Sequence, residues 1–136
     1  MMKILQPPGW EKPKGFSNGI AAKGGTTVFV AGQVAFDAGN IIQEKTFAGQ
    51  FRQTLKNTLA VLAEAGAGPE HIVRMTWYIT DKKEYLGAVK EVGAAYRELI
   101  GRHYPAMAVV QVVALMEDLA KVEIETTAVL PEGESA

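Results

Sequence analysis

Two stretches of this sequence repeat apolar residues at the spacing of an α-helix, and this repeat constrains the fold more than any other feature. In each stretch the apolar positions lie three and four residues apart, so they form one stripe on a helix. The first stripe, between residues 46 and 65, consists of Phe47, Phe51, Leu55, Leu59 and Leu62, and the second consists of Tyr85, Val89, Val92, Tyr96 and Leu99. Gly66 and Gly101 follow these stripes, where a left-handed residue commonly ends a helix. Because each helix has only one apolar face, we expect both helices to cover the same face of a sheet.

The segments around these helices are rich in β-branched residues and predict strands. We expect strands at about residues 18–23, 26–34, 41–42, 72–80, 107–113 and 121–130, with a hairpin turn at Gly24 and Gly25 and a further turn at 37–40. Asp81 begins an Asp-Lys-Lys-Glu sequence that resembles a capping box for the second helix. The order of elements is then β-β-β-α-β-α-β-β. This order predicts an α+β protein with a mixed sheet of about six strands and two helices on one face.

Two of the predicted strands are apolar on both sides. Residues 28–30 and, apart from Gln111, residues 106–113 have hydrophobic side chains at consecutive positions, a pattern typical of a strand buried on both faces. Once the helices have covered one face of the sheet, no other part of a 136-residue chain is long enough to cover the second face. We therefore expect another copy of the chain to cover it.

Length and composition limit the classes of function. The 136 residues predict a single domain over 1–136, with a core at about 16–130 and loose tails at 1–15 and 131–136. The formal net charge is −1 and Lys and Arg are scattered, so no surface for nucleic acid or an anionic membrane is expected. No apolar stretch approaches the roughly 20 residues of a membrane helix, which favours a cytoplasmic location.

The same composition limits the chemistry. The chain has no cysteine, so it has neither a thiol nucleophile nor a thiolate metal site. The two histidines, His71 and His103, have no spacing that makes a ligand pair, and we interpret both as loop residues. We expect no metal site and no cofactor.

Two glutamates on the last predicted strand are the most informative polar residues. Side chains alternate along a strand, so Glu123, Glu125 and Thr127 share one face, opposite Val122 and Ile124. One interpretation is that the glutamates are solvated acids on an exposed edge. The other is that a carboxylate enclosed at a subunit contact transfers a proton or orients a water molecule.

Four segments of the chain match one family in order and spacing. They are residues 28–34, where the family has a strand with Val-Ser-Gly-Gln, the helix end at 59–68, the pair Pro105 and Ala106 at the entry to a strand, and residues 122–129. In these segments, and over residues 16–130 as a whole, the chain resembles the Rid family of reactive intermediate deaminases, also called YjgF-like or L-PSP proteins. The resemblance implies a chorismate-mutase-like fold, a homotrimer and three ligand clefts between subunits.

The resemblance also implies an activity. Members of the family hydrolyse enamines and imines such as 2-aminoacrylate to a keto acid and ammonia, without a cofactor. Carried over position by position, the cleft includes Phe16, Gly32, Val109 and Glu123. Glu123 takes the place of the carboxylate that helps to position the attacking water.

The chain departs from the family pattern where an arginine normally follows the Pro-Ala pair and binds the substrate carboxylate. Met107 occupies this position, and a thioether has neither a charge nor a hydrogen-bond donor. Met107 is interpreted either as a core residue at a subunit contact or as a cleft wall for a more apolar ligand. Lys90 stands where the family commonly has Asn, and it is either a solvated helix residue or a cation that returns charge to the cleft.

We therefore expect a divergent Rid-type hydrolase that deaminates an enamine or imine other than a simple 2-imino acid. The alternative is a trimeric protein that binds a small ligand or a partner without turnover. An endoribonuclease, as the L-PSP label suggests, is the least favoured, because the sequence shows no basic surface with interleaved aromatic residues and no obvious pair of catalytic histidines.

Overall fold

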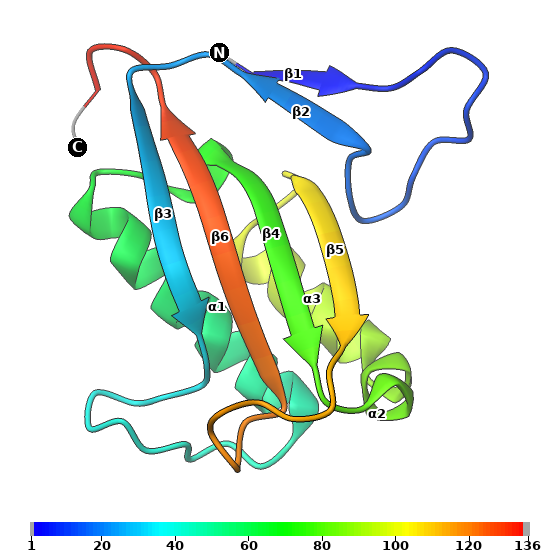
Figure 1. The fold of residues 1–136 in the computed structure, drawn as a ribbon, viewed down its shortest axis with the longest axis vertical. Helices are drawn as coiled ribbons and strands as arrows, with labels where there is room; N and C mark the ends of the chain where they lie inside the picture. Colours follow the sequence, from blue (N-terminus) through cyan, green and yellow to red (C-terminus); the bar gives the residue numbers. More distant parts are fainter. Residues whose placement is uncertain (1, 135–136) are drawn as a thin grey trace.

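The computed structural model describes residues 2–134, and its centre is a four-stranded sheet with strand order β3-β6-β4-β5. The strands are β3 (Thr26–Gln33), β4 (Ile72–Ile79), β5 (Ala106–Gln111) and β6 (Val122–Leu130). The pair β4 and β5 is parallel and the other pairs are antiparallel, so the sheet is mixed. The helices are α1 (Phe47–Glu64), α2 (Lys82–Gly87) and α3 (Val89–Leu99), and a 3-10 turn spans Pro69–His71. Figure 1 shows α1 and α3 on the same face of the sheet, as the single apolar stripes predict.

The first helix begins and ends where the sequence predicts. Thr46 caps its first turn, because Oγ1 of Thr46 accepts a hydrogen bond from the N–H of Gly49 at 3.0 Å. The stripe residues Phe51 and Leu55 are fully buried against the sheet. Gly66 has a φ of 75°, the left-handed conformation expected after a helix.

The second predicted helix is divided into α2 and α3. Asp81 caps α2, because its Oδ1 atom accepts hydrogen bonds from the N–H groups of Lys83 at 2.9 Å and Glu84 at 3.1 Å. The helix is interrupted at Ala88, where φ is −113° and ψ is 7°. Gly87 precedes the break, and glycine is a weak helix former, so the local sequence allows the interruption.

Part of the segment expected to be a loose tail, residues 1–15, forms a strand, and residues 6–15 contain no helix or strand. The strand β1 (Met2–Leu5) pairs antiparallel with β2 (Gly19–Ala22), and the two form a separate sheet. Residue 1 and residues 135–136, which belong to the predicted tails, lie outside the described residues. The chain therefore has the expected number of strands in the described part, but they form two sheets instead of one.

The predicted hairpin turn at Gly24 and Gly25 is also wrong, because β2 pairs with β1 and not with β3. The N–H of Gly25 donates to the carbonyl of Leu130 at 3.0 Å. A Cβ atom at Gly24 would lie 2.5 Å from the same carbonyl oxygen. The two glycines thus let the chain pass very close to the end of β6.

The predicted turn at residues 37–40 is present, but the strand expected at 41–42 is reduced to one bridge between Phe36 and Ile42. Oδ1 of Asp37 accepts hydrogen bonds from the N–H groups of Gly39 at 2.9 Å and Ile41 at 3.0 Å. Because the side chain of Asp37 takes up these N–H groups, the segment closes as a turn and no ladder forms.

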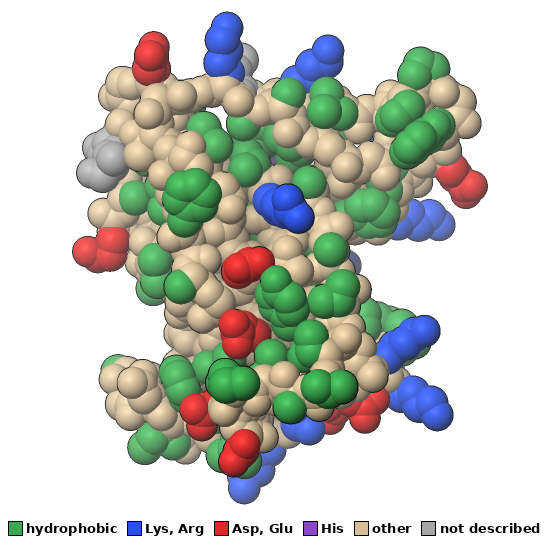
Figure 2. All heavy atoms as spheres, viewed as in Figure 1, with side chains coloured by type: hydrophobic (Ala, Val, Ile, Leu, Met, Phe, Trp, Pro, Cys, Tyr) green, Lys and Arg blue, Asp and Glu red, His purple; other side chains and the backbone are tan. Residues whose placement is uncertain are grey.

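In the described chain only one face of the four-stranded sheet is covered. Along β6, Val122 and Ile124 point to the helices, whereas Glu123, Glu125 and Thr127 point to the other face, as predicted. Figure 2 shows this open face, where apolar side chains surround a few charged groups. No helix within residues 2–134 is both long enough and apolar enough to span a membrane.

Candidate functional site

A pocket of about 510 Å³ lies between α3 and β5, which is an edge strand of the sheet. This volume is within the range of small-molecule sites. Met107 and Val109 of β5 face the pocket, since they pair in register with Met75 and Trp77, which are buried under the helices. Phe16 from the segment before β2 also lines it.

Phe16 reaches the pocket because its neighbour Ser17 is fixed to the entry of β5. The N–H of Ser17 donates to the Pro105 carbonyl at 3.1 Å, and the hydroxyl of Ser17 donates to the Tyr104 carbonyl at 2.5 Å. Ser17 is buried, so water does not compete for these hydrogen bonds. Two distant parts of the sequence are thereby joined in one pocket.

Aromatic side chains form the inner wall of this pocket. The rings of Trp77 and Tyr96 have centroids 6.2 Å apart, and Tyr96 stacks on Tyr104 at 5.7 Å with an interplanar angle of 8°. Burial raises the pKa of Tyr96 and of Tyr85, so both phenols stay neutral at physiological pH. The wall is therefore apolar and carries no phenolate.

Glu123 lies elsewhere, against the backbone of Gly32 at the end of β3. A Cβ atom built at Gly32 would overlap Oε2 of Glu123, so any other residue here would displace the carboxylate from this position. Within residues 2–134, the carboxylate of Glu123 has no hydrogen bond or ion pair. It is partly buried and free to bind a ligand or a water molecule.

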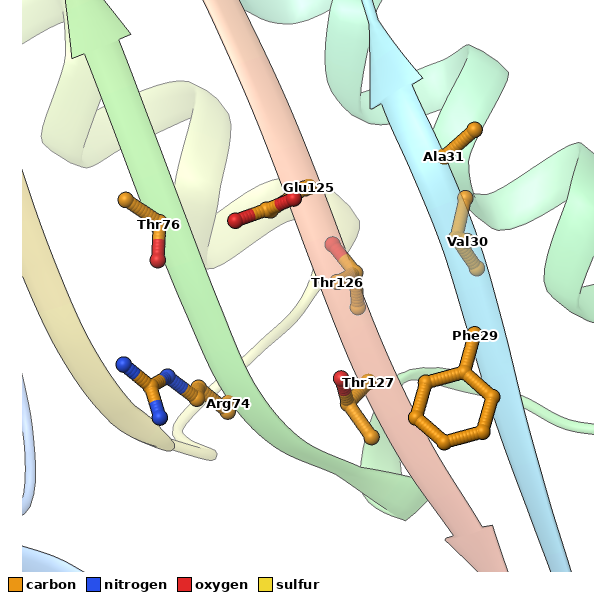
Figure 3. Close-up of a pocket in the computed structure, with 8 residues that line it drawn as sticks. All are labelled: Phe29, Val30, Ala31, Arg74, Thr76, Glu125, Thr126 and Thr127. Carbon is orange, nitrogen blue, oxygen red and sulfur yellow. The ribbon is translucent and has the colours of Figure 1, made fainter.

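Glu125, two residues further along β6, already has a partner. The hydroxyl of Tyr78 donates to Oε1 of Glu125 at 2.8 Å, and this hydrogen bond raises the pKa of Tyr78. Glu125 lines a groove of about 470 Å³ on the open face, together with Arg74 and Phe29 (Figure 3). The two glutamates thus share a face but differ in their surroundings.

The residues predicted for the site fall into two groups within one chain. Phe16, Met107 and Val109 lie at the β5 edge on the helix side, whereas Gly32 and Glu123 lie at β3 and β6, with Glu123 on the open face. The strand β4 separates β6 from β5, so Glu123 lies two strand spacings, roughly 10 Å, from the residues on β5 and on the opposite face of the sheet. Within one copy of the chain, the two groups of predicted site residues therefore do not form a single site.

The chain is similar to known proteins over nearly its whole length. The family model described as Endoribonuclease L-PSP matches residues 11–130. A RutC family protein from Synechocystis sp. is 36% identical over 133 residues, which cover 96% of this chain and 98% of that protein.

The chain belongs to the Rid family.

Relatives with a named activity and a solved structure support this assignment. A protein of Salmonella typhimurium named 2-iminobutanoate/2-iminopropanoate deaminase is 31% identical over 108 residues, covering 77% of this chain and 80% of that protein. The crystal structure of a Rid-family protein of unknown function from Yersinia pestis has a TM-score of 0.82 at 31% identity, covering 95% of this chain and 98% of that one. The resemblance drawn from the sequence motifs and the expected α+β, chorismate-mutase-like fold are confirmed.

Within residues 2–134, the pocket is lined by two cations, and neither is Lys90, which the comparison with the Rid pattern suggests. Met107 packs against the core, so β5 supplies no positive charge to the pocket. Lys90 is exposed on α3 and does not line it. The cations that do line the pocket are Lys14 and Arg97, which the sequence reasoning missed. The spacing of four residues places Arg97 and Gly93 on one face of α3, but only the packing of β5 shows that this face lines the pocket.

Both histidines of this Rid protein hold the backbone in place. Nε2 of His103 lies 2.6 Å from the carbonyl of Ile72, and since a carbonyl only accepts, Nε2 carries the hydrogen. Nδ1 of His71 accepts a hydrogen bond from the N–H of Gly68 at 3.0 Å. His103 lies in a loop, as predicted, whereas His71 is the last residue of the 3-10 turn.

Proposed function

We propose that this Rid protein hydrolyses the C=N bond of an imine, or of an enamine after tautomerisation, and releases ammonia. The observation that carries the proposal is the carboxylate of Glu123, which lies against the backbone of Gly32 and has no partner in the described chain. The named activity of the Salmonella typhimurium relative supports the reaction class.

In this proposal Glu123 transfers the protons of the hydrolysis. The carboxylate accepts a proton from water while the water oxygen bonds to the C=N carbon and the electron pair of that bond moves to nitrogen. Glu123 returns that proton to the nitrogen, which gives a carbinolamine with a hydroxyl and an amino group on the same carbon. The carboxylate then carries the hydroxyl proton to the amino group, and the C–N bond breaks to release ammonia as the C=O bond forms. Water is the only co-reactant, and a carboxylate positioned for this role contributes on the order of 10²–10⁴ in rate.

The cleft, in this proposal, forms between subunits of a homotrimer. The open sheet face carries exposed apolar side chains, with Phe29 77% exposed and Val110 41% exposed. A large exposed apolar surface on a sheet is a common sign of an interface. A neighbouring subunit on this face would bring its own β5 pocket toward Glu123 and join the two groups of site residues.

The substrate, in this proposal, is not a simple 2-imino acid such as the short imine that 2-aminoacrylate forms by tautomerisation. The family arginine is replaced by Met107, whose thioether cannot form the paired hydrogen bonds that a guanidinium makes with a carboxylate. The loss of such a pair corresponds to roughly tenfold to a hundredfold in affinity for the carboxylate.

The test is ammonia release from 2-aminoacrylate, generated in place from serine by a dehydratase, and from imines of larger amino acids, generated in place by an amino acid oxidase. We expect wild-type protein to be slow with 2-aminoacrylate and faster with imines that have larger side chains. The variant Met107→Arg should accelerate 2-aminoacrylate hydrolysis by roughly tenfold or more. If no imine of the panel releases ammonia faster than it does without protein, the chain is a binding protein and the proposed activity is wrong.

A further inference from the structure

The pocket between α3 and β5 is positively charged although the family arginine is absent. Lys14 and Arg97 line it, and no aspartate or glutamate is among the residues that do. An anion that enters would meet two cations without repulsion from a carboxylate. The phenols in the wall add no negative charge, because burial raises the pKa of Tyr85 and Tyr96.

The helix α3 places the guanidinium of Arg97 at the pocket. Val89, Gly93 and Arg97 lie on one face of α3 at intervals of four residues, and all three line the pocket. Nη1 of Arg97 lies so close to Gly93 that a Cβ atom there would be 3.2 Å away. The missing side chain at Gly93 thus provides the space over which the guanidinium folds.

Arg97 has no carboxylate partner among residues 2–134, which distinguishes it from Arg52. Nη1 of Arg52 donates to Oε1 of Glu98 at 3.0 Å, and this contact raises the pKa of Arg52. The donors of Arg97 are free for a ligand. A guanidinium presents its donors in a planar fork that matches the two oxygens of a carboxylate.

The rest of the pocket suits an apolar group. Phe16, Trp77 and Tyr104 supply aromatic surface, and Met107 supplies a flexible thioether that adapts to the shape of a ligand. The volume of about 510 Å³ is larger than an acid of three carbon atoms requires. The low polarity of the wall also strengthens any charge pair at its rim.

We propose that Arg97, assisted by Lys14, binds the carboxylate of an acid whose apolar or aromatic side chain lies against Phe16 and Met107. This inference rests on the proposed function and specifies its substrate class, an imine or enamine of an amino acid with a large apolar side chain. The anion-binding cation is supplied by α3, so the carboxylate lies along the helix and the side chain fills the space that the family arginine would occupy on β5.

The experiment measures binding of two stable probes, 3-phenylpropanoate and its neutral amide, by calorimetry at low salt. Wild-type protein should bind the acid more tightly than the amide. Arg97→Gln should lower the affinity for the acid by roughly tenfold to a hundredfold and leave the affinity for the amide unchanged. Arg97→Lys keeps the charge but loses the planar fork, so its affinity for the acid should lie between those of wild type and Arg97→Gln. Lys56→Gln makes an equal change of charge at an exposed position of α1. It is the control, and its affinities for the acid and the amide should match those of wild type.

The inference is overturned if Arg97→Gln binds the acid as tightly as wild type does, or if the wild type does not distinguish the acid from the amide. Neither probe contains a C=N bond, so this result does not depend on catalysis. A protein that binds the acid through Arg97 but releases no ammonia from any imine would refute the proposed hydrolysis and leave the anion site in place.

Discussion

At the scale of single residues, the free carboxylate of Glu123 distinguishes it from Glu125. Replacing Glu123 with Gln keeps the shape of the side chain and removes the charge that would accept a proton from water. We expect Glu123→Gln to lower ammonia release from the best imine on the order of 10²-fold or more, with folding and subunit mass unchanged. The matched change Glu125→Gln removes an acid that already pairs with Tyr78 and should have a much smaller effect. Equal activity of the two variants would show that Glu123 is structural.

A substitution at Gly32 tests the role of Glu123 in a second way, because it moves the carboxylate and keeps its charge. In Gly32→Ala the new Cβ atom would lie 2.8 Å from Cδ of Glu123, so the carboxylate must move. We expect turnover to fall while the free energy of unfolding, measured with urea, changes by about 1 kcal/mol or less, because Glu123 can turn toward water. Ala31→Gly, at the neighbouring exposed position of β3, controls for backbone effects. Unchanged turnover in Gly32→Ala would argue against this placement of the catalytic carboxylate.

At the scale of elements, one ion pair connects α1 to α3, which carries Arg97. Arg52 donates to Glu98, and this hydrogen bond lowers the pKa of Glu98 below its usual value of 4.5. A carboxylate with a lowered pKa stabilises the fold above its unfolded pKa and loses that contribution as the pH falls through the folded pKa. We therefore expect wild-type protein to lose more stability than Glu98→Gln when the pH falls from 7 to 3.

The measurement is urea unfolding at both pH values, at low and at high salt. The pair is exposed at the surface, so the difference between wild type and variant should be small and should shrink as salt screens it. Glu64→Gln, an exposed acid on α1 without an ion pair among the described residues, is the control and should retain the wild-type pH dependence. A Glu98→Gln protein with the pH dependence of wild type would mean that the pair does not couple the helices.

At the scale of the whole molecule, the open face of the sheet decides whether the two groups of site residues meet. Light scattering after size exclusion should give a mass of about three times 14.6 kDa. Phe29→Glu places a charge on the exposed apolar surface and should shift the mass toward that of one chain, because an unpaired charge is costly to bury. Val61→Glu, at an exposed apolar position of α1, is the control and should not change the mass. A folded wild-type monomer at micromolar concentration would contradict both the trimer and the shared cleft.

The features that the sequence predicted correctly are those encoded in residues close together along the chain. The stripe of α1 follows from spacings of three and four residues, and the end of the helix follows from the glycine at position 66. The alternation of β6, which places Glu123 and Ile124 on opposite faces, follows from the period of a strand. The motifs of the Rid family are equally local, and the family assignment followed from their order.

The features that only the tertiary structure decided depend on residues far apart in sequence. Nothing local to Gly24 and Gly25 shows that β2 pairs with a strand at residues 2–5 or that the glycines pass the end of β6. Likewise, Lys90 and Arg97 are equivalent candidates on a helix until the position of β5 shows which one lines the pocket. Strand pairing and pocket walls are set by packing between distant segments, and a pattern in one segment does not contain that information.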